Sequence, residues 1–125
     1  MNILEFTILL PPVTKKNSQQ ILVNKRTGKP FIMPSKKYRE YVKMAGLYIP
    51  AMDKPLDGQY NITCLFYMPT RRRVDLTNLL EAVDDVMVET GLLMDDHSGI
   101  IAGHDGSRVL YDNVNPRTYV AINEL

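Results

Sequence analysis

The sequence predicts an α+β fold in which one mixed β-sheet carries two main helices on one face. Two observations favour this fold: short runs rich in β-branched and aromatic residues recur along the chain, and two longer segments show apolar residues at helical spacing. Hydrophobic residues make up 45% of the 125 residues, which suffices for one buried core without disulfides. We therefore expect residues 1–125 to form a single domain.

The first strand is expected at Leu4–Leu10, an apolar run that is closed by two prolines, because proline cannot donate to a ladder. Gln20–Val23 and Pro30–Met33 flank a polar connection that contains Gly28. This pattern is typical of a β-hairpin, and its basic tip is a candidate for a flexible arm that contacts DNA.

The first helix is expected to run from Ser35, a good N-cap, to about Ile49, where Pro50 ends the pattern. Its apolar positions recur at helical spacing: Tyr38, Tyr41, Val42, Ala45 and Ile49. Basic residues occupy the remaining face: Lys36, Lys37, Arg39 and Lys43. Tyrosines on an amphipathic helix pack in a core more often than they stack on bases, so we expect core packing for Tyr38, Tyr41 and Tyr48.

The second half begins with a strand at Tyr60–Tyr67, in which Cys64 is expected to pack. The second helix is expected at Leu76–Thr90, with Gly91 just past its end. Its apolar stripe is Leu76, Leu79, Leu80, Val83 and Met87. Three short strands complete the predicted order: Ile100–Ala102, Val109–Tyr111 and Thr118–Ile122.

The net charge of +1 conceals a separation of charge along the chain. Residues 1–73 hold 13 Lys and Arg and 4 Asp and Glu, whereas residues 74–125 hold 2 and 10. A basic half can neutralise the phosphates of a nucleic acid, and an acidic half can hold a cation. The near-neutral total therefore does not argue against a nucleic-acid partner.

The single cysteine excludes an internal disulfide framework. No apolar run approaches the roughly 20 residues that are needed to cross a bilayer. The N-terminus also lacks the basic segment of a signal peptide. We therefore expect a reducing, cytoplasmic compartment and no membrane partner.

The segment from residue 67 to residue 97 combines cations and acids. Asp75, at the entrance of the second helix, comes shortly after three arginines: Arg71, Arg72 and Arg73. Helical spacing gives the polar residues of this helix a common face: Thr77, Asn78, Glu81 and Asp85. Asp95 and Asp96 come after the helix, and a strand at residues 98–102 beside the preceding strand would bring Asp96 back along it.

Several oxygen ligands near one point, without paired cysteine or histidine, suit a hard cation such as Mg²⁺ or Mn²⁺. Beside arginines, such a metal indicates a substrate that carries phosphate. Each piece also has a simpler explanation, because Asp75 can be an N-cap and the Asp95-Asp96 pair a turn. Surface positions are expected for the other helix acids and for the two histidines: Asp84, Asp85, Glu89, His97 and His104.

A resemblance to the RusA family rests on one motif, Met68-Pro69-x-Arg71-Arg72-Arg73-x-Asp75-Leu76-x-Asn78-Leu79, followed by Gly91 and Asp95-Asp96. Members of this family are small endodeoxyribonucleases of phages and prophages that resolve Holliday junctions in recombination and repair. The opening of the chain is also similar to that of the family, with Pro11-Pro12, Asn17 in a basic loop, and a basic first helix.

The resemblance implies a RusA-like fold, a homodimer and a requirement for Mg²⁺ or Mn²⁺. A dimer suits a four-way junction because a two-fold axis supplies two active sites for two equivalent cuts. The family pattern makes Asp75 and Asp96 catalytic, and we add Glu81. The predicted metal ligands are the same three residues and Asp95.

Two positions depart from the family pattern. The family commonly has Asp-Leu-Asp-Asn, but Thr77 takes the second acidic position here, and threonine cannot replace an anionic metal ligand. The family also often has a lysine where this chain has Glu81. Thr77 and Glu81 are four residues apart on one helical face, so we hypothesise that Glu81 supplies the missing carboxylate.

The predicted DNA-binding residues are Lys15, Lys16, Asn17, Lys36, Lys37, Arg71, Arg72 and Arg73. Phosphate contacts of this kind give affinity that is independent of DNA sequence and sensitive to salt. Two other functions stay open: a non-catalytic or weakly active branched-DNA-binding protein of the same family, and a protein-interaction domain whose charged halves pair between subunits.

Overall fold

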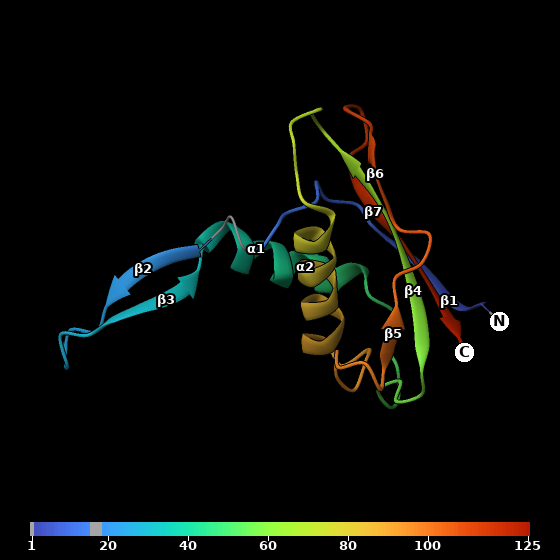
Figure 1. The fold of residues 1–125 in the computed structure, drawn as a ribbon, viewed down its shortest axis with the longest axis horizontal. Helices are drawn as coiled ribbons and strands as arrows, with labels where there is room; N and C mark the ends of the chain where they lie inside the picture. The colour runs from blue at the N-terminus through green and yellow to red at the C-terminus, as the bar shows by residue number, and fades with distance from the viewer. Residues whose placement is uncertain (1, 16–18) are drawn as a thin grey trace.

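The computed structural model describes residues 2–15 and 19–125. The fold is α+β, with two helices packed on a sheet that has both parallel and antiparallel strands, and it confirms the predicted fold class. Figure 1 shows the sheet along one side of the molecule, both helices on the same side of it, and a two-stranded hairpin that extends beyond the helices.

Five strands form the sheet. β1 (Asn2–Ile8), β7 (Arg117–Glu124) and β4 (Tyr60–Met68) pair antiparallel in that order. β5 (Ile101–Gly103) and β6 (Arg108–Tyr111) both pair parallel with β4, β5 near its beginning and β6 near its end. The chain therefore returns beside β4 after the second helix, an arrangement that the sequence suggested but did not establish.

The turn between β5 and β6 covers the middle of the β4 edge with hydrogen bonds. The Thr63 hydroxyl donates to the carbonyl of Asp105 at 2.8 Å, and the Cys64 amide donates to the Ser107 hydroxyl at 2.9 Å. The side-chain oxygen of Asn61 accepts a hydrogen bond from the Asp105 amide at 2.8 Å. The turn thus satisfies polar groups of β4 between the two short strands.

Helix α1 (Lys36–Ala45) begins where the sequence predicts, because the Ser35 hydroxyl accepts a hydrogen bond from the Tyr38 amide at 3.2 Å. The α-helix is shorter than predicted. A 3-10 turn, Gly46–Tyr48, completes the segment before Pro50.

Helix α2 (Leu76–Glu89) matches its prediction to within one residue. Gly91, with a φ of 82°, follows it in the left-handed conformation that glycine adopts most readily. In the described ranges, no helix combines the length and the apolar content that crossing a bilayer requires.

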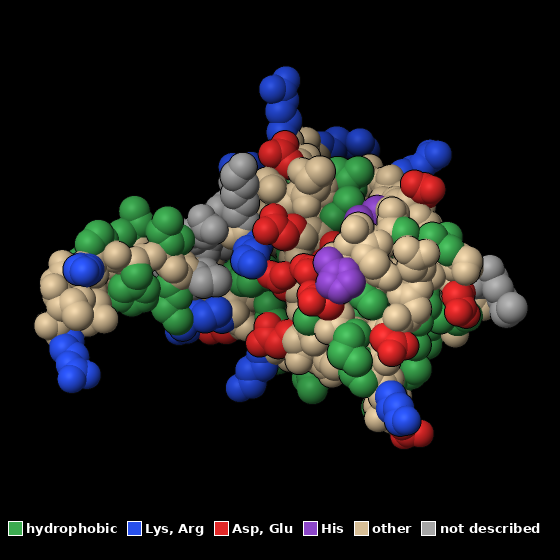
Figure 2. Space-filling view, turned by 60° about the horizontal axis from the view of Figure 1, so that its bottom comes forward, with side chains coloured by type: hydrophobic (Ala, Val, Ile, Leu, Met, Phe, Trp, Pro, Cys, Tyr) green, Lys and Arg blue, Asp and Glu red, His purple; other side chains and the backbone are tan. Residues whose placement is uncertain are grey.

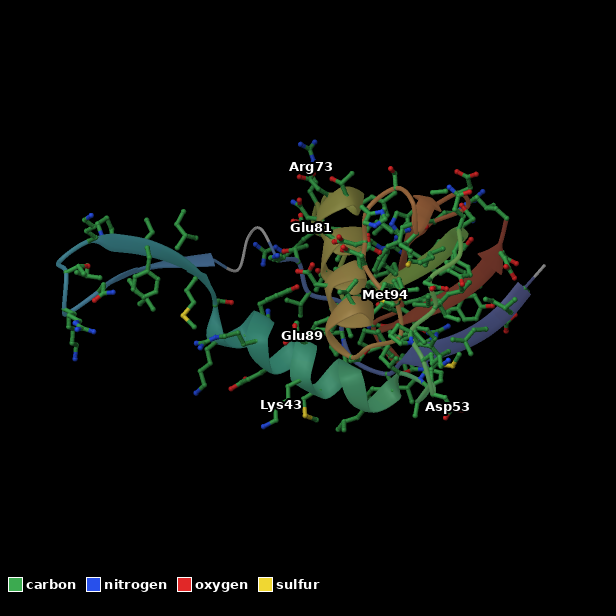
Figure 3. The ribbon with its side chains drawn as sticks, turned by 90° about the horizontal axis from the view of Figure 1, so that it is seen from below. Lys43, Asp53, Arg73, Glu81, Glu89 and Met94 are labelled. Carbon is green, nitrogen blue, oxygen red and sulfur yellow. The ribbon has the colours of Figure 1, made fainter. Side chains whose placement is uncertain are left out.

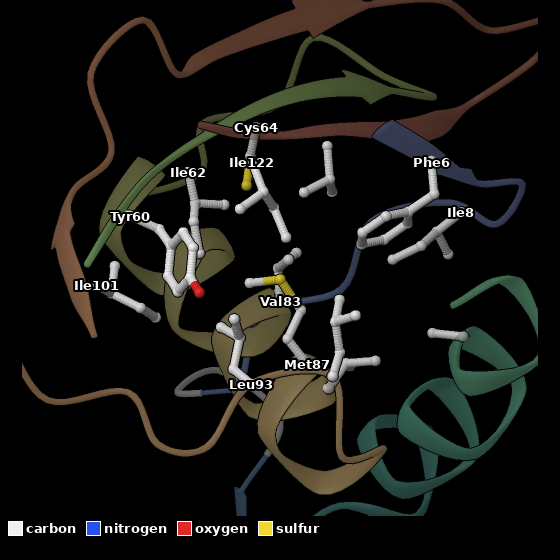
Figure 4. Close-up of a cluster of buried hydrophobic side chains, with 14 of the residues drawn as sticks. Phe6, Ile8, Tyr60, Ile62, Cys64, Val83, Met87, Leu93, Ile101 and Ile122 are labelled. Carbon is white, nitrogen blue, oxygen red and sulfur yellow. The ribbon is translucent and has the colours of Figure 1, made fainter. Parts of the chain in front are cut away.

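The core lies between α2 and the sheet (Figure 4). Ile62, Cys64 and Phe66 alternate along β4 and are fully buried, and Val83 and Met87 of α2 belong to the same cluster. Burial raises the pKa of the Cys64 thiol, so this cysteine packs as an inert apolar residue, as predicted. Tyr38 and Tyr41 are buried, as expected, whereas Tyr48 is partly buried and packs against the core cluster.

A separate two-stranded sheet confirms the predicted hairpin. β2 (Gln19–Val23) and β3 (Pro30–Pro34) pair antiparallel, and Gly28 in their connection has a φ of 71°. This hairpin arm, residues 19–34, projects away from the helices (Figure 1). Its apolar side chains are largely exposed, with Ile21 at 74% and Ile32 at 67%.

Candidate active site and DNA interface

Asp75 occupies the N-cap position of α2, with extended backbone angles (φ −83°, ψ 125°). Its side chain makes no hydrogen bond to the helix backbone. Instead, one carboxylate oxygen accepts a hydrogen bond from the side-chain amide of Asn78 at 3.3 Å. The carboxylate is exposed and oriented by Asn78, which itself is buried.

The Asp95-Asp96 pair lies in the loop after α2. Leu92 and Leu93 are buried and fix the start of this loop, and the Met94 amide donates to the carbonyl of Leu56 at 2.9 Å. Asp95 and Asp96 are exposed, and an Asp95 carboxylate oxygen accepts a hydrogen bond from the Asp96 amide at 2.7 Å. Both carboxylates of the pair are therefore accessible to solvent.

The negative charge of Asp96 acts on groups at the middle of α2. Burial raises the pKa of Asp84, and the negative charge of Asp96 adds to the rise. A hydrogen bond to Asp85 raises the pKa of Lys15, and the charges of Glu81 and Asp96 act in the same direction. Asp96 is thus within electrostatic reach of the Glu81–Asp85 turn of α2.

Asp85 does not lie on a solvated face, and that expectation was wrong. Its Oδ2 atom is 2.8 Å from the ammonium of Lys15, and the Tyr38 hydroxyl donates to the same oxygen at 2.9 Å. Burial raises the pKa of the Tyr38 phenol, and the hydrogen bond to Asp85 adds to the effect. The contact joins three separate segments: the loop after β1, helix α1 and helix α2.

Asp84 and His104 were also expected to be solvated, and that expectation was wrong as well. The imidazole lies 3.0 Å from Asp84 Oδ2 through Nε2 and 2.8 Å from the Ile62 carbonyl through Nδ1. The side chain of Asp84 is only 15% exposed, and that of His104 is only 20% exposed. The other carboxylate oxygen of Asp84 is buried without a hydrogen-bond partner in the described part of the chain. Glu89 and His97 are exposed, as expected.

The predicted metal ligands do not form a closed cage. Among residues 2–15 and 19–125, no three Asp, Glu, His or Cys side chains converge closely enough to hold a metal ion. Each member of the predicted set, Asp75, Glu81, Asp95 and Asp96, is exposed to solvent. Carboxylate oxygens of this kind suit Mg²⁺ or Mn²⁺ chemically, so this ligand set stays a prediction.

The arginines lie beside the start of α2. All three are exposed, and the guanidinium of Arg71 lies 4.1 Å from the centre of the Tyr111 ring on β6. Arg72 and Arg73 line a groove of about 390 Å³ together with Lys37 of α1. The structure therefore brings together two predicted DNA-binding groups that are distant in sequence, and we call this groove the basic groove.

The other predicted DNA-binding residues are placed differently. Lys36 is exposed on α1, and its ammonium is 3.8 Å from Glu40 one turn away. Lys15 is paired with Asp85, as described above. Lys16 and Asn17 lie outside the described residues.

Charge is distributed unevenly over the surface. Figure 2 shows acidic side chains gathered over the middle of one face, around a histidine, with lysines and arginines projecting at the periphery. Figure 3 shows Arg73 at the beginning of α2, and Glu81 and Glu89 further along the helix. The basic groove thus adjoins the end of α2 at which its row of acids begins.

Comparison with protein-family models gives a match to "Endodeoxyribonuclease RusA" over residues 10–123. The chain belongs to the RusA family. A comparison with curated proteins found no match.

The RusA match spans every candidate residue from Lys15 to Asp96. Membership in this family confirms the resemblance and, with it, the RusA-like character of the fold. RusA proteins are nucleases that act on branched DNA and generally depend on a divalent metal. The family does not by itself assign the individual side chains described above.

Three residues near the site were missed or misjudged from sequence. Tyr38 was predicted to be buried, but not to bond Asp85 through its hydroxyl. His104 and Tyr111 were given no role, although they contact Asp84 and Arg71. Their sequence separation from these partners leaves no local pattern, so only the fold reveals the contacts.

Proposed function

We propose that the protein is a metal-dependent, structure-selective endodeoxyribonuclease that resolves Holliday junctions by hydrolysing phosphodiester bonds. Family membership supports the nuclease activity. One observation supports this particular use of the site: the basic groove is lined by Lys37, Arg72 and Arg73, and also by Val74, the residue immediately before Asp75. A phosphate held by these cations would lie beside the row of carboxylates.

The carboxylates are assigned complementary roles. Asp75, Glu81 and Asp96 are the catalytic residues, and with Asp95 they hold the Mg²⁺ or Mn²⁺. The metal supplies Lewis-acid activation of water and of the phosphate. Asn78 orients the Asp75 carboxylate through their hydrogen bond. Thr77, which is exposed, contributes no negative charge, so Glu81 supplies the third carboxylate on this face.

DNA binding relies on phosphate contacts. The volume of the basic groove, about 390 Å³, suits a sugar–phosphate segment rather than a whole base pair. Lys36 and the tip of the hairpin arm extend the basic surface, and the affinity of Lys and Arg for phosphates does not depend on base sequence. Lys16 and Asn17 remain predicted contributors.

A homodimer follows from the geometry of the substrate. A four-way junction has two equivalent strands to cut, and two copies related by a two-fold axis present two active sites to them. We infer a cytoplasmic compartment from the DNA substrate and from the single cysteine, Cys64, which is buried as a thiol.

Cleavage of a synthetic four-way junction in Mg²⁺ or Mn²⁺ tests the proposal. Wild type should make paired symmetric cuts, and Asp75→Asn should bind the junction but cut at least ~100-fold more slowly, because it loses a charge that stabilises the transition state. Asp57→Asn, an exposed acid in the loop before β4, is the matched control and should cut normally. Cutting of linear duplex at the same rate would contradict structure selectivity.

A second candidate is a junction-binding protein of the RusA family that cuts weakly or not at all. Thr77 favours it, because this position lacks the carboxylate that the family pattern commonly has. Tight junction binding without cleavage in Mn²⁺ would support this alternative.

A further inference from the structure

We infer that Lys15 is a further catalytic residue: its ammonium, held at the Glu81–Asp85 turn of α2, contacts the phosphate that is cut rather than a phosphate along the DNA path. This inference rests on the proposed nuclease function and adds a residue and a role to it. The observation that carries it is the contact of the Lys15 ammonium with Asp85 of α2, in a hollow between the two helices.

The position of Lys15 is well defined by its partners. Its Nζ atom is 2.8 Å from Asp85 Oδ2, and both side chains are partly shielded, at 31% and 24% exposed. Glu81 and Asp96 are near enough for their charges to favour the protonated amine. Because a lysine at an open surface would sample many rotamers, this convergence of partners indicates a fixed ammonium.

Tyr38 makes the arrangement rigid. Its hydroxyl donates to the same Asp85 oxygen that binds Lys15, and Tyr38 itself is only 4% exposed. Asp85 therefore has its Oδ2 held from two sides, by a buried phenol and by the ammonium. A positioned, partly dehydrated charge of this kind interacts with a substrate more strongly than a mobile surface lysine.

The ammonium can reach DNA. Lys15, Tyr38 and Asp85 line a hollow of about 640 Å³ between α1 and α2, together with Arg39 and Lys43. A lysine ammonium has three N–H donors, and the hydrogen bond to Asp85 uses one of them. The remaining donors can serve an oxygen of a phosphate that enters from the acidic side of α2.

The local charge explains why such a cation is needed. Asp85 contacts Lys15, and the negative charges of Glu81 and Asp96 also act on this ammonium; these carboxylates would repel a DNA phosphate. Lys15 offsets part of this charge and stabilises the additional negative charge that develops on the phosphate during hydrolysis. By the same logic, its charge also weakens the attraction of the carboxylates for a divalent cation.

Two kinds of role for Lys15 predict different results. A phosphate contact along the DNA path would contribute to junction affinity, and cleavage of fully bound DNA would be normal without it. A residue at the reacting phosphate would contribute mainly to the rate of the bound complex. A purely structural contact would affect thermal stability and leave junction affinity and the cleavage rate of the bound complex unchanged.

The test compares Lys15→Met, Lys15→Arg and the control Lys54→Met, which removes an exposed lysine of the loop before β4. Three quantities are measured: the Kd for a four-way junction without metal, the single-turnover cleavage rate at saturating junction in Mn²⁺, and Mn²⁺ affinity of the protein alone by electron paramagnetic resonance. Melting temperatures verify that each variant is folded.

For Lys15→Met we expect cleavage of the bound junction to fall ~100-fold, as for the loss of one transition-state donor. Junction Kd should change less than about threefold, since phosphates elsewhere provide most of the affinity. Mn²⁺ should bind about threefold to tenfold more tightly, because a competing charge is gone. Lys15→Arg should keep part of the cleavage rate, and Lys54→Met should resemble wild type in all three quantities.

If Lys15→Met had a higher Kd for the junction but a normal cleavage rate at saturating junction, the inference would be overturned. Lys15 would then be a phosphate contact along the DNA path. Unchanged Kd, rate and Mn²⁺ affinity with a lower melting temperature would also overturn the inference. If wild type cuts no junction, the proposed function fails separately. In that case unchanged Mn²⁺ affinity in Lys15→Met would overturn the placement of Lys15 at the metal-binding carboxylates, and tighter binding would uphold it.

Discussion

The imidazole of His104 links α2 to the sheet, since Nε2 lies 3.0 Å from an Asp84 oxygen and Nδ1 lies 2.8 Å from the carbonyl of Ile62. A carbonyl only accepts, so Nδ1 must carry a proton. The contact with Asp84 then requires one more proton, either on Nε2 or on the carboxyl group. The folded protein therefore holds a proton between these two side chains, with the charges of Asp85 and Asp96 nearby.

Stability should depend on pH through this pair. Burial lowers the pKa of His104, but the hydrogen bond and charge of Asp84 outweigh it and raise the pKa above 6.5. A raised pKa means that the folded state binds the proton more tightly, so the stabilisation is complete below about pH 6.5 and is lost as pH rises through the folded pKa. His104→Gln should cost about 2 kcal/mol near pH 6 and less near pH 9.

Urea unfolding of wild type and His104→Gln between pH 5.5 and 9 measures this effect. His97→Gln is the control, because His97 is exposed and its imidazole accepts a hydrogen bond from the nearby Gly99 amide. The same pH slope in wild type and His104→Gln would contradict a proton shared with Asp84.

Glu81 is expected to be essential for metal binding. Glu81→Ala should weaken Mn²⁺ binding at least ~tenfold, because the number of carboxylates largely sets the affinity for such cations. Glu89→Ala removes an exposed acid of the same helix, two turns further on, and should bind Mn²⁺ normally. Unchanged Mn²⁺ affinity and cutting in Glu81→Ala would refute the compensation hypothesis.

Thr77 should be a site at which metal affinity can be gained. Thr77→Asp adds a carboxylate to an exposed position of the first turn of α2, near Asp75 and Glu81. We expect about tenfold tighter Mn²⁺ binding, since affinity increases with the count of charged ligands. Isothermal titration of the Thr77→Asp protein measures this, and weaker binding than wild type would place the metal away from this turn.

The arginines of the basic groove should determine the salt dependence of DNA binding. Arg72→Ala and Arg73→Ala should each reduce the slope of log affinity against log salt by about 1 if each contacts one phosphate. Fluorescence anisotropy with a labelled four-way junction at several salt concentrations gives the slope. Lys54→Ala, an exposed change in the loop before β4, should leave it unaltered. Equal slopes in all variants would exclude the groove from the DNA path.

The tip of the hairpin arm should contribute to DNA binding without contributing to stability. Changing Lys25, Arg26 and Lys29 together to Gln should weaken junction affinity several-fold, since up to three phosphate contacts are lost. The melting temperature should stay the same, because all three side chains are exposed on the arm. A lower melting temperature with normal junction affinity would assign the tip to structure instead.

Most elements of the fold could be predicted because their signals are local. Ser35 caps α1 through its own side chain, and Gly91 ends α2 in a conformation that other residues rarely adopt. The ends of α1 were less predictable, because apolar spacing does not distinguish an α-helical turn from a 3-10 turn at Gly46–Tyr48.

The site was predictable in composition but not in contacts. The motif around Asp75 identified the RusA family, and the family match confirms it. The partners of Asp84 and Asp85 were misjudged because they come from distant segments, and acids on a helix are solvated in most proteins. The sequence indicated a lysine lost at position 81, whereas the structure brings an ammonium to the same turn from Lys15.

The cover over the middle of β4 should also protect the protein from aggregation at high concentration. A long open strand invites the same strand of another copy to pair with it, which is a route to aggregation. Here that edge is divided into two short strands, β5 and β6, and the hydrogen bonds of Thr63 and Cys64 to the turn occupy the gap. Shortening this turn would therefore be expected to reduce solubility before it altered the fold.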